Sequence, residues 1–542
     1  MIRFGTRGSR LARAQTEQVA QELAERSGED WDTVVIETRG DLTLDVPLPA
    51  IGGKGVFTQE LEQALRAGEI DAAVHSYKDL PVELPEDLVI GAVPARVSPV
   101  DVLLHTQGDA GDPSSDVVLD SGTVVGTSSP RRRCALLAQR TDLKTEDIRG
   151  NVPTRIDKLR EGKYGAIILA SAGIERLNLT LDDLLCHRLS PREFTPAPGQ
   201  GAIAVQCRRD DARTRELFAS LHHEETARCV DAERALLARL GGGCSMPLGA
   251  MVQRDADGRF QIIASLYSEA GSGRPAARVF VERDGEDPMA LIEEIALVLG
   301  PLVGEPLQGA RLLLLRPGGE AGDLGAALAV AGALVATVAL TEIVPLSVDV
   351  AEFKDLAHTV AFSSVRAVDR YFDLVGDTAT ELGSTAYFAG GPATARAVMS
   401  HGHSCLSPAE GAGGEALAEL VAAHCSAEDG PVVFPCAAHR HPAFERAMVS
   451  FGYQVRAVPV YDSGAIKQVK LPEQEFDAVI FTSPSAARAF KEVGQQLKGH
   501  YLGLGPTTAE AMTEMELPLA GVAKRPTASS LVSLIKELCD AN

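Results

Sequence analysis

The stretch TVVGTSSPRRRCALLAQ, residues 123–139, joins a short β-branched run to a turn of small polar residues and then to a helical pattern. The same order recurs in TVVIET, YGAIILASAG, LLLLRP, TVAFSS, PVVFPC, FDAVIFTS and YLGLGP, where Gly, Ser, Thr or Pro and an amphipathic segment follow nearly every run. Strands that alternate with helices are typical of α/β domains with largely parallel sheets. The sequence therefore predicts an α/β fold.

The chain length predicts several domains, because 542 residues are too many for one compact core and correspond to roughly three or four domains. Residues 222–303 differ in pattern, with a helix, a glycine loop and the strand-like runs FQIIASLYS and RVFVER, which predict a small α+β domain. Pro and Gly near 300–313 indicate a linker. Beyond it, TVAFSSVRAV resembles AVIFTSPSAA, and YFAGGPATARAV resembles YLGLGPTTAEAM, which predicts two similar lobes.

The overall charge and composition exclude several classes of partner. A net charge of −22 repels nucleic acid and anionic membranes, and 5% aromatic residues leave little surface for stacking bases. Nine cysteines without a CxxC pair indicate reduced thiols. We see no leader segment, and no apolar run reaches the roughly 18 residues that span a bilayer. We therefore expect a cytoplasmic protein that binds neither nucleic acid nor membranes.

Several loops of the first half combine hydroxyl groups with cations at predicted strand ends and helix starts. Singly, a Ser at a helix start is usually an N-cap, GGKG lacks the spacing of a nucleotide-binding P-loop, and RRR is commonly a solvated face. Together, helix N-termini and arginines in an acidic chain predict a cleft for a ligand with several carboxylates or phosphates. The loops contribute Arg7, Ser9, Lys54, His75, Ser76, Lys78, Asp79, Thr127, Ser128, Ser129, Arg131, Arg132, Arg149, Arg155 and Arg176.

The stretch RLGGGCSMP, residues 239–247, places Cys244 after three glycines. Three glycines supply no packing partners, so a buried structural role does not account for this thiol. An exposed nucleophile with backbone freedom does. We interpret Cys244 as a thiol that a ligand reaches.

Seven motifs in order, TRGSRLA, GGKGVFTQELE, HSYKDLP, GTSSPRRR, RGNVPTR, PAPGQGA and GGGCSMP, resemble the porphobilinogen deaminase (hydroxymethylbilane synthase) family over residues 1 to about 303. The resemblance implies two α/β lobes of the periplasmic-binding-protein type and a small α+β domain that carries the cysteine loop. The implied boundaries are 1–98 with 198–221 for the first lobe, 99–197 for the second, 222–303 for the third domain and 304–310 for a linker.

The resemblance also implies the chemistry of these residues. Cys244 matches the cysteine that holds a dipyrromethane cofactor through a thioether, and Asp79 matches the catalytic acid, which stabilises the azafulvenium formed when porphobilinogen loses ammonia. Ala50, Pro130 and Pro153 depart from the family pattern. The cofactor-binding positions are Cys244, Arg131, Arg132, Ser129, Lys78 and Asp79, and the substrate-binding positions are Arg7, Ser9, Lys54, Ser76, Thr127, Arg149, Arg155, Arg176 and Gln200.

The second half resembles uroporphyrinogen-III synthase in LLLRP, FSS, GGPATA, PVYDS, FTSPSA and GLGPTTA. The resemblance implies one lobe from 311–345 with 463–542 and another from 346–462. It matches Tyr461 to a tyrosine that helps the terminal hydroxyl of the substrate to leave. It also matches Thr394, Ser483, Thr507 and Thr508 to residues that bind substrate carboxylates. We expect no metal, because His439-Arg440-His441 are neighbours that do not converge.

The two resemblances predict a monomeric, bifunctional enzyme that condenses four porphobilinogen into hydroxymethylbilane and cyclises it to uroporphyrinogen III. One alternative is a two-lobed solute-binding or sensor protein, although such proteins do not need Cys244 together with Asp79. A second alternative is a working deaminase whose synthase-like half is inactive or serves only in docking. The isomer of the porphyrinogen product distinguishes these hypotheses.

Overall fold

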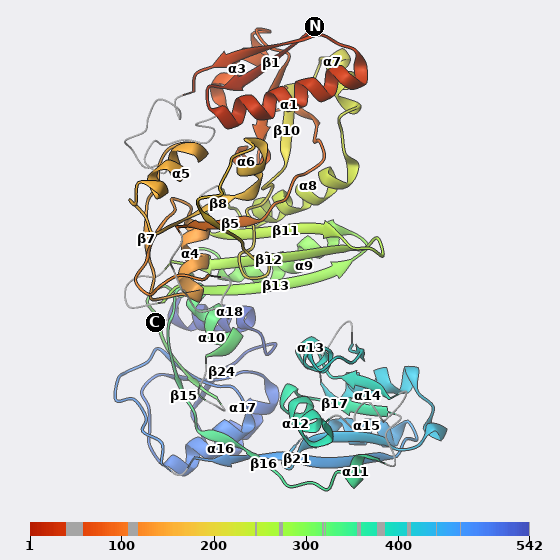
Figure 1. Cartoon of the computed structure of the whole chain (residues 1–542). Helices are drawn as coiled ribbons and strands as arrows, with labels where there is room; N and C mark the ends of the chain where they lie inside the picture. The colour runs from red at the N-terminus through yellow and green to blue at the C-terminus, as the bar shows by residue number, and fades with distance from the viewer. Residues whose placement is uncertain are drawn as a thin grey trace. The chain divides into compact units, whose positions relative to one another are not determined.

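The computed structural model (Figure 1) forms two compact units. Unit 1 comprises Met1–Arg311, Gly322–Val335 and Pro526–Asn542, and unit 2 comprises Leu312–Ala321 and Ala336–Arg525. Strands and helices alternate through both units, which confirms the predicted multidomain α/β fold. The structure describes residues 1–38, 58–106, 117–243, 246–269, 275–316, 319, 321–354, 359–376, 385–408, 413–440, 442–466 and 468–540.

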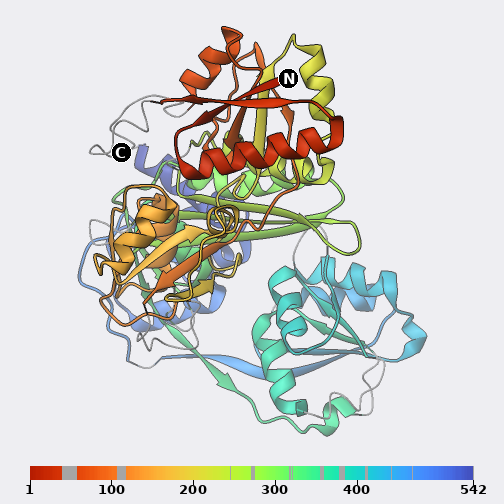
Figure 2. The same ribbon diagram turned by 45° about the horizontal axis from the view of Figure 1, so that its top comes forward.

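The first sheet of unit 1 has the strand order β2-β1-β3-β10-β4. Strand β1 pairs in parallel with β2 and β3, whereas β10 runs antiparallel to β3 and β4. Helix α1 lies along one face of this sheet (Figure 2), where its Val19 and Leu23 join Ile2 and Phe4 in one buried cluster. The elements are β1 (Ile2–Arg7), α1 (Arg10–Ser27), β2 (Trp31–Ile36), α3 (Gln59–Arg66), β3 (Ala72–Ser76), η2 (Tyr77–Asp79), β4 (Leu88–Ala92), β10 (Ile203–Arg208) and α7 (Ala212–Ala219).

The second sheet of unit 1 has the order β7-β6-β8-β5-β9. Strand β6 is parallel to β7 and β8, and β5 is antiparallel to β8 and β9. Leu103, Val125, Leu136 and Ile168 belong to its buried core. The elements are β5 (Asp101–His105), β6 (Val124–Gly126), α4 (Pro130–Gln139), β7 (Lys144–Glu146), α5 (Val152–Arg160), β8 (Ala166–Ala170), α6 (Ser171–Arg176) and β9 (Leu185–Arg188).

The PAPGQGA motif lies where the chain returns from the second sheet to the first. Gly199 and Gly201 have φ values of 75° and 83°, a region that side chains disfavour. A Cβ on Gly201 would also lie 2.6 Å from the carbonyl oxygen of Val97, in the outgoing segment. The two glycines therefore let the outgoing and returning segments pass closely, with Gln200 fully buried between them.

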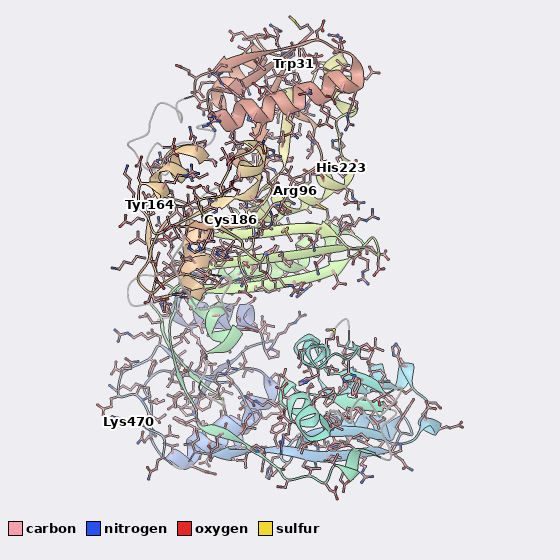
Figure 3. All side chains as sticks on the ribbon, in the orientation of Figure 1. Trp31, Arg96, Tyr164, Cys186, His223 and Lys470 are labelled. Carbon is pink, nitrogen blue, oxygen red and sulfur yellow. The ribbon has the colours of Figure 1, made fainter. Side chains whose placement is uncertain are left out.

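The third sheet of unit 1 is an antiparallel meander, β11-β12-β13. The fully buried Glu233 of α8 ties this part to the inter-sheet segments. It accepts hydrogen bonds from Arg96 Nη1 at 2.6 Å and from the backbone N–H groups of Gly199 at 2.7 Å and Val252 at 2.8 Å. Figure 3 labels Arg96 close to helix α8. The elements are α8 (Glu224–Arg239), β11 (Leu248–Arg254), β12 (Phe260–Ser268), β13 (Ala277–Gly285), α9 (Pro288–Leu299) and η3 (Gly300–Leu302).

Two helices from beyond the predicted linker also belong to unit 1. Helix α10 (Gly322–Val330) packs against β13, and α18 (Ala528–Asp540) packs against α10 and η3. Ser529 Oγ donates a hydrogen bond of 3.1 Å to the carbonyl oxygen of Val298. Unit 1 is therefore built from three separate stretches of chain. The finer domain boundaries expected from the sequence stay a prediction.

Unit 2 is built around two sheets, ordered β15-β14-β22-β23-β24 and β16-β21-β20-β17-β18-β19. Among the described pairings, only β16 with β21 is antiparallel in these two sheets. The strands are β14 (Arg311–Leu315), β15 (Leu334–Val338), β16 (Thr341–Pro345), β17 (Thr359–Phe362), β18 (Ala386–Ala389), β19 (Cys405–Leu406), β20 (Val432–Ala437), β21 (Val455–Ala465), β22 (Ala478–Phe481), β23 (His500–Gly503) and β24 (Leu519–Val522). The helices are α11 (Ala351–Lys354), α12 (Val365–Val375), α13 (Pro392–Ser400), α14 (Gly414–His424), η5 (Ala427–Asp429), α15 (Ala443–Ser450), α16 (Pro484–Val493) and α17 (Pro506–Glu514).

Candidate functional site

Two strand ends and one helix start meet in a pocket at the first sheet of unit 1. Arg7 ends β1, and Ser9 caps α1 by accepting a hydrogen bond of 3.2 Å from the backbone N–H of Ala12. Ser76 ends the neighbouring strand β3, and the exposed Asp79 follows on η2. The structure thus brings together four predicted site residues. The pocket is lined by Arg7, Ser9, Leu11, Ala12, Gln15, Thr58, Val74, His75, Ser76 and Asp79.

Sequence reasoning did not select Gln15, which belongs to the same pocket. Its side chain is buried on α1, and its Nε2 donates a hydrogen bond of 3.0 Å to Ser76 Oγ. A glutamine on the inward face of an amphipathic helix, less than two turns after Ser9, was the available signal. Gln15 therefore links the helix start to the end of β3.

His75 lines this pocket without adding charge to it. Its Nε2 lies 3.2 Å from Gln206 Oε1. Burial lowers the pKa of His75 to about 4, and the neighbouring charge of Arg7 acts in the same direction. At neutral pH the imidazole is uncharged, so the positive charge among the described lining residues comes from Arg7.

A second group of predicted residues surrounds the start of α4. Ser129 caps the helix by accepting a hydrogen bond of 3.4 Å from the backbone N–H of Arg132, and Pro130 follows in the first turn. Pro153 occupies the first turn of α5, after the N-cap Asn151. Proline suits this position because its φ is helical and its missing N–H would be unpaired there. The two prolines that depart from the family pattern therefore fit the helix starts.

The cations of this group are crowded and partly buried. Burial lowers the pKa of Lys78 to about 8, opposed by the Asp79 charge and assisted by the charges of Arg132 and Arg131. Burial lowers the pKa of Arg155 to about 10, with further contributions from Arg132 and Arg149, and burial alone accounts for an Arg176 pKa of about 10. Burial and neighbouring positive charges disfavour the charged forms of these side chains. A bound anion would offset both effects.

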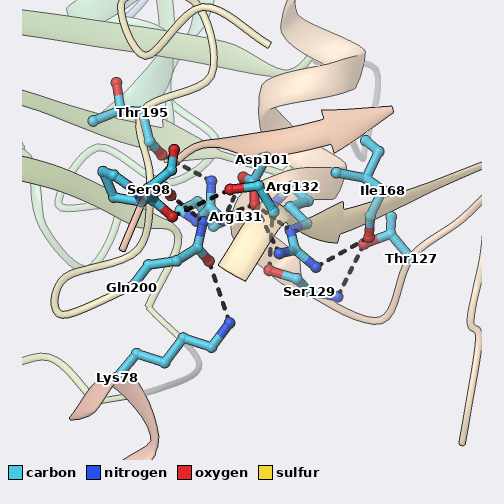
Figure 4. A network of polar contacts seen from close by, with 12 residues as sticks. Lys78, Ser98, Asp101, Thr127, Ser129, Arg131, Arg132, Ile168, Thr195 and Gln200 are labelled. Carbon is cyan, nitrogen blue, oxygen red and sulfur yellow. Dashed lines mark hydrogen bonds and ion pairs between the residues drawn. The ribbon is translucent and has the colours of Figure 1, made fainter. Parts of the chain in front are cut away.

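Asp101, which the sequence did not single out, holds both central arginines (Figure 4). Arg131 and Arg132 are 4% and 7% exposed, so they are not a solvated face. Burial would raise the pKa of Asp101, but the Arg131 and Arg132 charges outweigh it and hold the pKa well below its usual range. An acid at the head of the apolar run DVLLH was the sequence signal that pointed to it.

In unit 2 the predicted residues fall into two groups, one on each sheet. Ser483 caps α16 after β22, and Thr507 and Thr508 begin α17 after the adjacent parallel strand β23. On the other sheet, Tyr461 of β21 is 8% exposed, and Thr394 of α13 is 7% exposed. Helix starts at the carboxyl ends of parallel strands present backbone N–H groups to anions.

Ser364 is a residue of this second sheet that sequence reasoning did not select. It caps α12 by accepting a hydrogen bond of 3.2 Å from the backbone N–H of Ala367, and its Oγ lies 3.1 Å from Tyr461 Oη. The motif FSS, which ends in Ser364, was the available signal. The Tyr461 hydroxyl is thus tied to a helix N-terminus.

Two absences apply only to the part of the chain that the structure describes. Among those residues, no cluster of three or more His, Cys, Asp and Glu side chains is placed to bind a metal ion. Within the same described ranges, no helix has the length and apolar character needed to span a bilayer. His439 pairs with Asp462, whereas His441 lies outside the described residues.

Relatives of known family cover the first half of the chain. The porphobilinogen deaminase of Roseiflexus sp. (strain RS-1) is 48% identical over 257 residues, which is 47% of this chain and 82% of the relative. The chain belongs to the porphobilinogen deaminase family. The porphobilinogen deaminase of Shouchella clausii (strain KSM-K16) is 45% identical over 271 residues, covering 50% of this chain and 85% of the relative.

Family models extend the assignment along the chain. Residues 2–216 match the dipyrromethane cofactor binding domain of porphobilinogen deaminase, and residues 227–299 match its C-terminal domain. Residues 322–533 match uroporphyrinogen-III synthase HemD. The uroporphyrinogen-III synthetase of Helicobacter pylori 26695 covers 42% of this chain and 99% of its own, at 18% identity and a TM-score of 0.33. By the family models, the chain carries both porphobilinogen deaminase domains and a uroporphyrinogen-III synthase domain, which supports a bifunctional enzyme of tetrapyrrole biosynthesis.

The residues of the deaminase half suit the dipyrromethane that its matched domain binds. The porphobilinogen from which it is made carries acetate and propionate groups, and carboxylates pair well with guanidinium groups. Among the described residues, the Nε atoms of Arg131 and Arg176 are buried without a hydrogen-bond partner, so neither guanidinium group is fully paired within the protein. Lys54 and Cys244 lie outside the described residues.

Proposed function

We propose that Asp79 is the catalytic carboxylate of the deaminase half and that Cys244 carries the dipyrromethane. The observation that supports the first assignment is the pocket in which Asp79 lies with Arg7, Ser9 and Ser76. A lone carboxylate beside an arginine and two hydroxyls suits a substrate that carries both acids and a departing amine. Cys244 rests on the glycine-flanked sequence and on the family.

In the proposed reaction, Arg7 and Ser9 bind the carboxylates of porphobilinogen and hold its ring against Asp79. The C–N bond of the protonated aminomethyl group breaks, neutral ammonia leaves with the bonding electrons, and the pyrrole nitrogen takes up the positive charge. The Asp79 carboxylate stabilises that charge and accepts the N–H hydrogen bond. Lys54, Ser76, Thr127, Arg149, Arg155, Arg176 and Gln200 bind the remaining carboxylates of the growing chain.

Ser129, Lys78, Arg131 and Arg132 would hold the carboxylates of the dipyrromethane, with Cys244 as its covalent anchor. When bound, this group supplies the pyrrole to which each new ring is joined. The residues themselves contribute charge and orientation. Three of them are cations: Lys78 follows β3 of the first sheet, and Arg131 and Arg132 lie on α4 after β6 of the second.

For the synthase half we propose that Tyr461 helps the terminal hydroxyl of hydroxymethylbilane to leave. Its hydroxyl is tied to Ser364, the cap of α12, which orients it. Thr394, Ser483, Thr507 and Thr508 bind substrate carboxylates beside helix N-termini. The enzyme then acts mainly by folding the linear chain into the conformer that closes.

Two measurements test these assignments. Intact mass should show an added dipyrromethane in the wild-type chain and none in Cys244→Ser. Product analysis should show the type III porphyrinogen, because spontaneous closure gives type I. Type I alone would support the second reading, an active deaminase with an inactive synthase half.

We further propose that the enzyme works as a monomer in the cytoplasm and binds no nucleic acid. The described cysteines form no disulfide, which fits a reducing compartment. The acidic net charge of −22 opposes contact with polyanions. Sedimentation of the purified chain should give a single species of about 57 kDa, and a dimer would contradict the first of these proposals.

A further inference from the structure

The carboxylate of Asp101 is the centre of the polar network in Figure 4. Asp101 opens β5 and is fully buried. Its Oδ2 accepts a hydrogen bond of 2.8 Å from Arg131 Nη2. Its Oδ1 accepts bonds from Arg132 Nη2 at 2.7 Å, Arg132 Nε at 3.1 Å and Gln200 Nε2 at 2.9 Å. One buried carboxylate thus takes four hydrogen bonds from three side chains.

Each guanidinium is held on a second side by a backbone carbonyl. Arg131 Nη1 donates a hydrogen bond of 2.8 Å to the carbonyl oxygen of Thr195, and Arg132 Nη1 donates one of 3.1 Å to that of Ile168. A guanidinium is planar, so two fixed directions determine the orientation of the whole group. The donors left over on Arg131 and Arg132 therefore point where Asp101 and these carbonyls allow.

Gln200 extends the network from the second sheet to the first. Its Nε2 binds Asp101, while its Oε1 accepts a hydrogen bond of 3.2 Å from Lys78 Nζ. Gly199 and Gly201, both with positive φ, fix the backbone on either side. Asp101 on β5 is thereby connected through one buried amide to Lys78 on η2.

Loss of the Asp101 charge would have two opposite effects on the binding of a polycarboxylate, and an experiment can distinguish them. Lys78, Arg131 and Arg132 carry three positive charges, with Asp79 and Arg155 close by, whereas Asp101 carries a single buried negative charge. Removing that negative charge would strengthen the attraction for a polycarboxylate. Releasing the two guanidinium groups would weaken their fit to it.

We propose that Asp101 is a positioning residue for the carboxylate-binding arginines Arg131 and Arg132 and, through Gln200, for Lys78. This inference rests on the proposed function, in which these three cations hold the dipyrromethane. Orientation outweighs charge, because bidentate recognition depends on geometry. Loss of Asp101 therefore slows attachment of the cofactor to Cys244 although the site becomes more positive.

The test compares Asp101→Asn with Asp71→Asn. Asp71 also binds two arginines, since it accepts hydrogen bonds from Arg3 Nη2 at 2.9 Å and from Arg208 Nη2 at 3.4 Å, but both arginines are on strands of the first sheet and neither belongs to the network of Asp101. At a fixed early time after apo-chain is mixed with porphobilinogen, we expect the fraction of chains carrying the added mass to be about tenfold lower in Asp101→Asn, the rate equivalent of one charged hydrogen bond. Asp71→Asn should stay loaded at a similar loss of melting temperature.

Asp101→Glu separates position from charge, because it keeps the carboxylate and moves it by one methylene. We expect Asp101→Glu to load poorly as well. Full loading of Asp101→Asn, or a lower KM for porphobilinogen in that variant, would overturn the inference. If the wild type itself carries no added mass, or Cys244→Ser keeps it, the proposed function fails instead.

Gln200→Leu keeps the inference open to disproof if Asp101→Asn does not fold. Without the amide oxygen, the ammonium of Lys78 loses its hydrogen-bond acceptor, so its pKa falls further below about 8. The alkaline limb of kcat/KM should move to lower pH relative to the wild type. An unmoved limb would contradict the connection between Gln200 and Lys78.

Discussion

The predicted sites of the two halves of the molecule differ in their chemistry. In unit 1 the predicted site residues include Arg7, Lys78, Arg131 and Arg132, and a buried acid holds two of them. In unit 2 the predicted residues are hydroxyls at helix starts and one tyrosine. This difference fits the proposed functions. A growing polycarboxylate that is held through several condensations needs fixed charge, whereas a substrate that is only folded and closed needs shape and backbone donors.

The largest expected effect tests whether one charged group carries catalysis in unit 1. Asp79→Asn should lower kcat by roughly 100- to 1,000-fold, because the developing cation loses its stabilising carboxylate. Stopped assays of porphobilinogen consumption give the rate. The melting temperature should hardly change, because Asp79 is exposed. Near-normal turnover would remove Asp79 from the mechanism.

The second prediction tests whether the division between the halves follows the sequence order. Leu531 of α18 is fully buried, and α18 packs against α10 and η3 in unit 1. Leu531→Ala should lower the free energy of unfolding of unit 1 by about 2–4 kcal/mol, measured as loss of deaminase activity at a lower temperature. Leu297→Ala is the matched control, because Leu297 on α9 is 76% exposed and should cost less than about 0.5 kcal/mol. If the deaminase activity of both variants were lost at the same temperature, α18 would not contribute to the stability of unit 1.

A smaller effect is expected where unit 2 uses a single hydroxyl. Tyr461→Phe should lower the type III share of the product about tenfold relative to type I, since one hydrogen bond to the leaving group is lost. Porphobilinogen consumption should stay at the wild-type rate. Tyr453→Phe is the control, because Tyr453 Oη donates to Cys425 O at 2.6 Å and belongs to no predicted site. An unaltered isomer ratio in Tyr461→Phe would leave unit 2 without an assigned proton donor.

The smallest effect concerns pH. The Lys78 pKa of about 8 lies below the ordinary value, so the ammonium loses its proton as the pH rises through 8. Below that pH the charge is present and binds carboxylates. Because Lys78 is proposed to hold the dipyrromethane to which each ring is joined, kcat/KM for porphobilinogen should fall a few-fold, roughly threefold, between pH 7 and 9. Lys78→Arg should flatten this fall because arginine stays protonated, and an equal fall in both proteins would exclude Lys78 as its source.

The comparison of the halves also explains which residues the sequence could predict. Motifs such as TRGSRLA and GTSSPRRR place charged side chains next to helix starts, and Arg7, Ser9 and Ser129 lie at such starts in the structure. For Asp101 the sequence offered only an acid at the head of the apolar run DVLLH. Its role could not be predicted, because that role depends on the pairing of β5 with β8 and on a glutamine about a hundred residues away. Burial of Arg131 and Arg132 was missed for the same reason.

In unit 2 the alternation of strands and helices was sufficient to predict the fold class. It did not give the contact between Tyr461 and Ser364, which are far apart in sequence and meet only through the order of the strands. Backbone N–H groups carry no signature of their own in a sequence. Sites built from them are therefore recognised mainly through their position in a fold.

The threading of the chain sets the order in which the protein can be completed during translation. Unit 1 takes in residues 526–542 as well as the first 311 residues, with nearly all of unit 2 synthesised between them. At roughly 5–20 residues per second, the ribosome needs on the order of ten seconds or more to reach α18. Until then the surface formed by η3 and α10 lacks its partner helix. In the nascent chain, the deaminase half is therefore synthesised before the last helix of unit 1, which follows nearly all of unit 2 in the sequence.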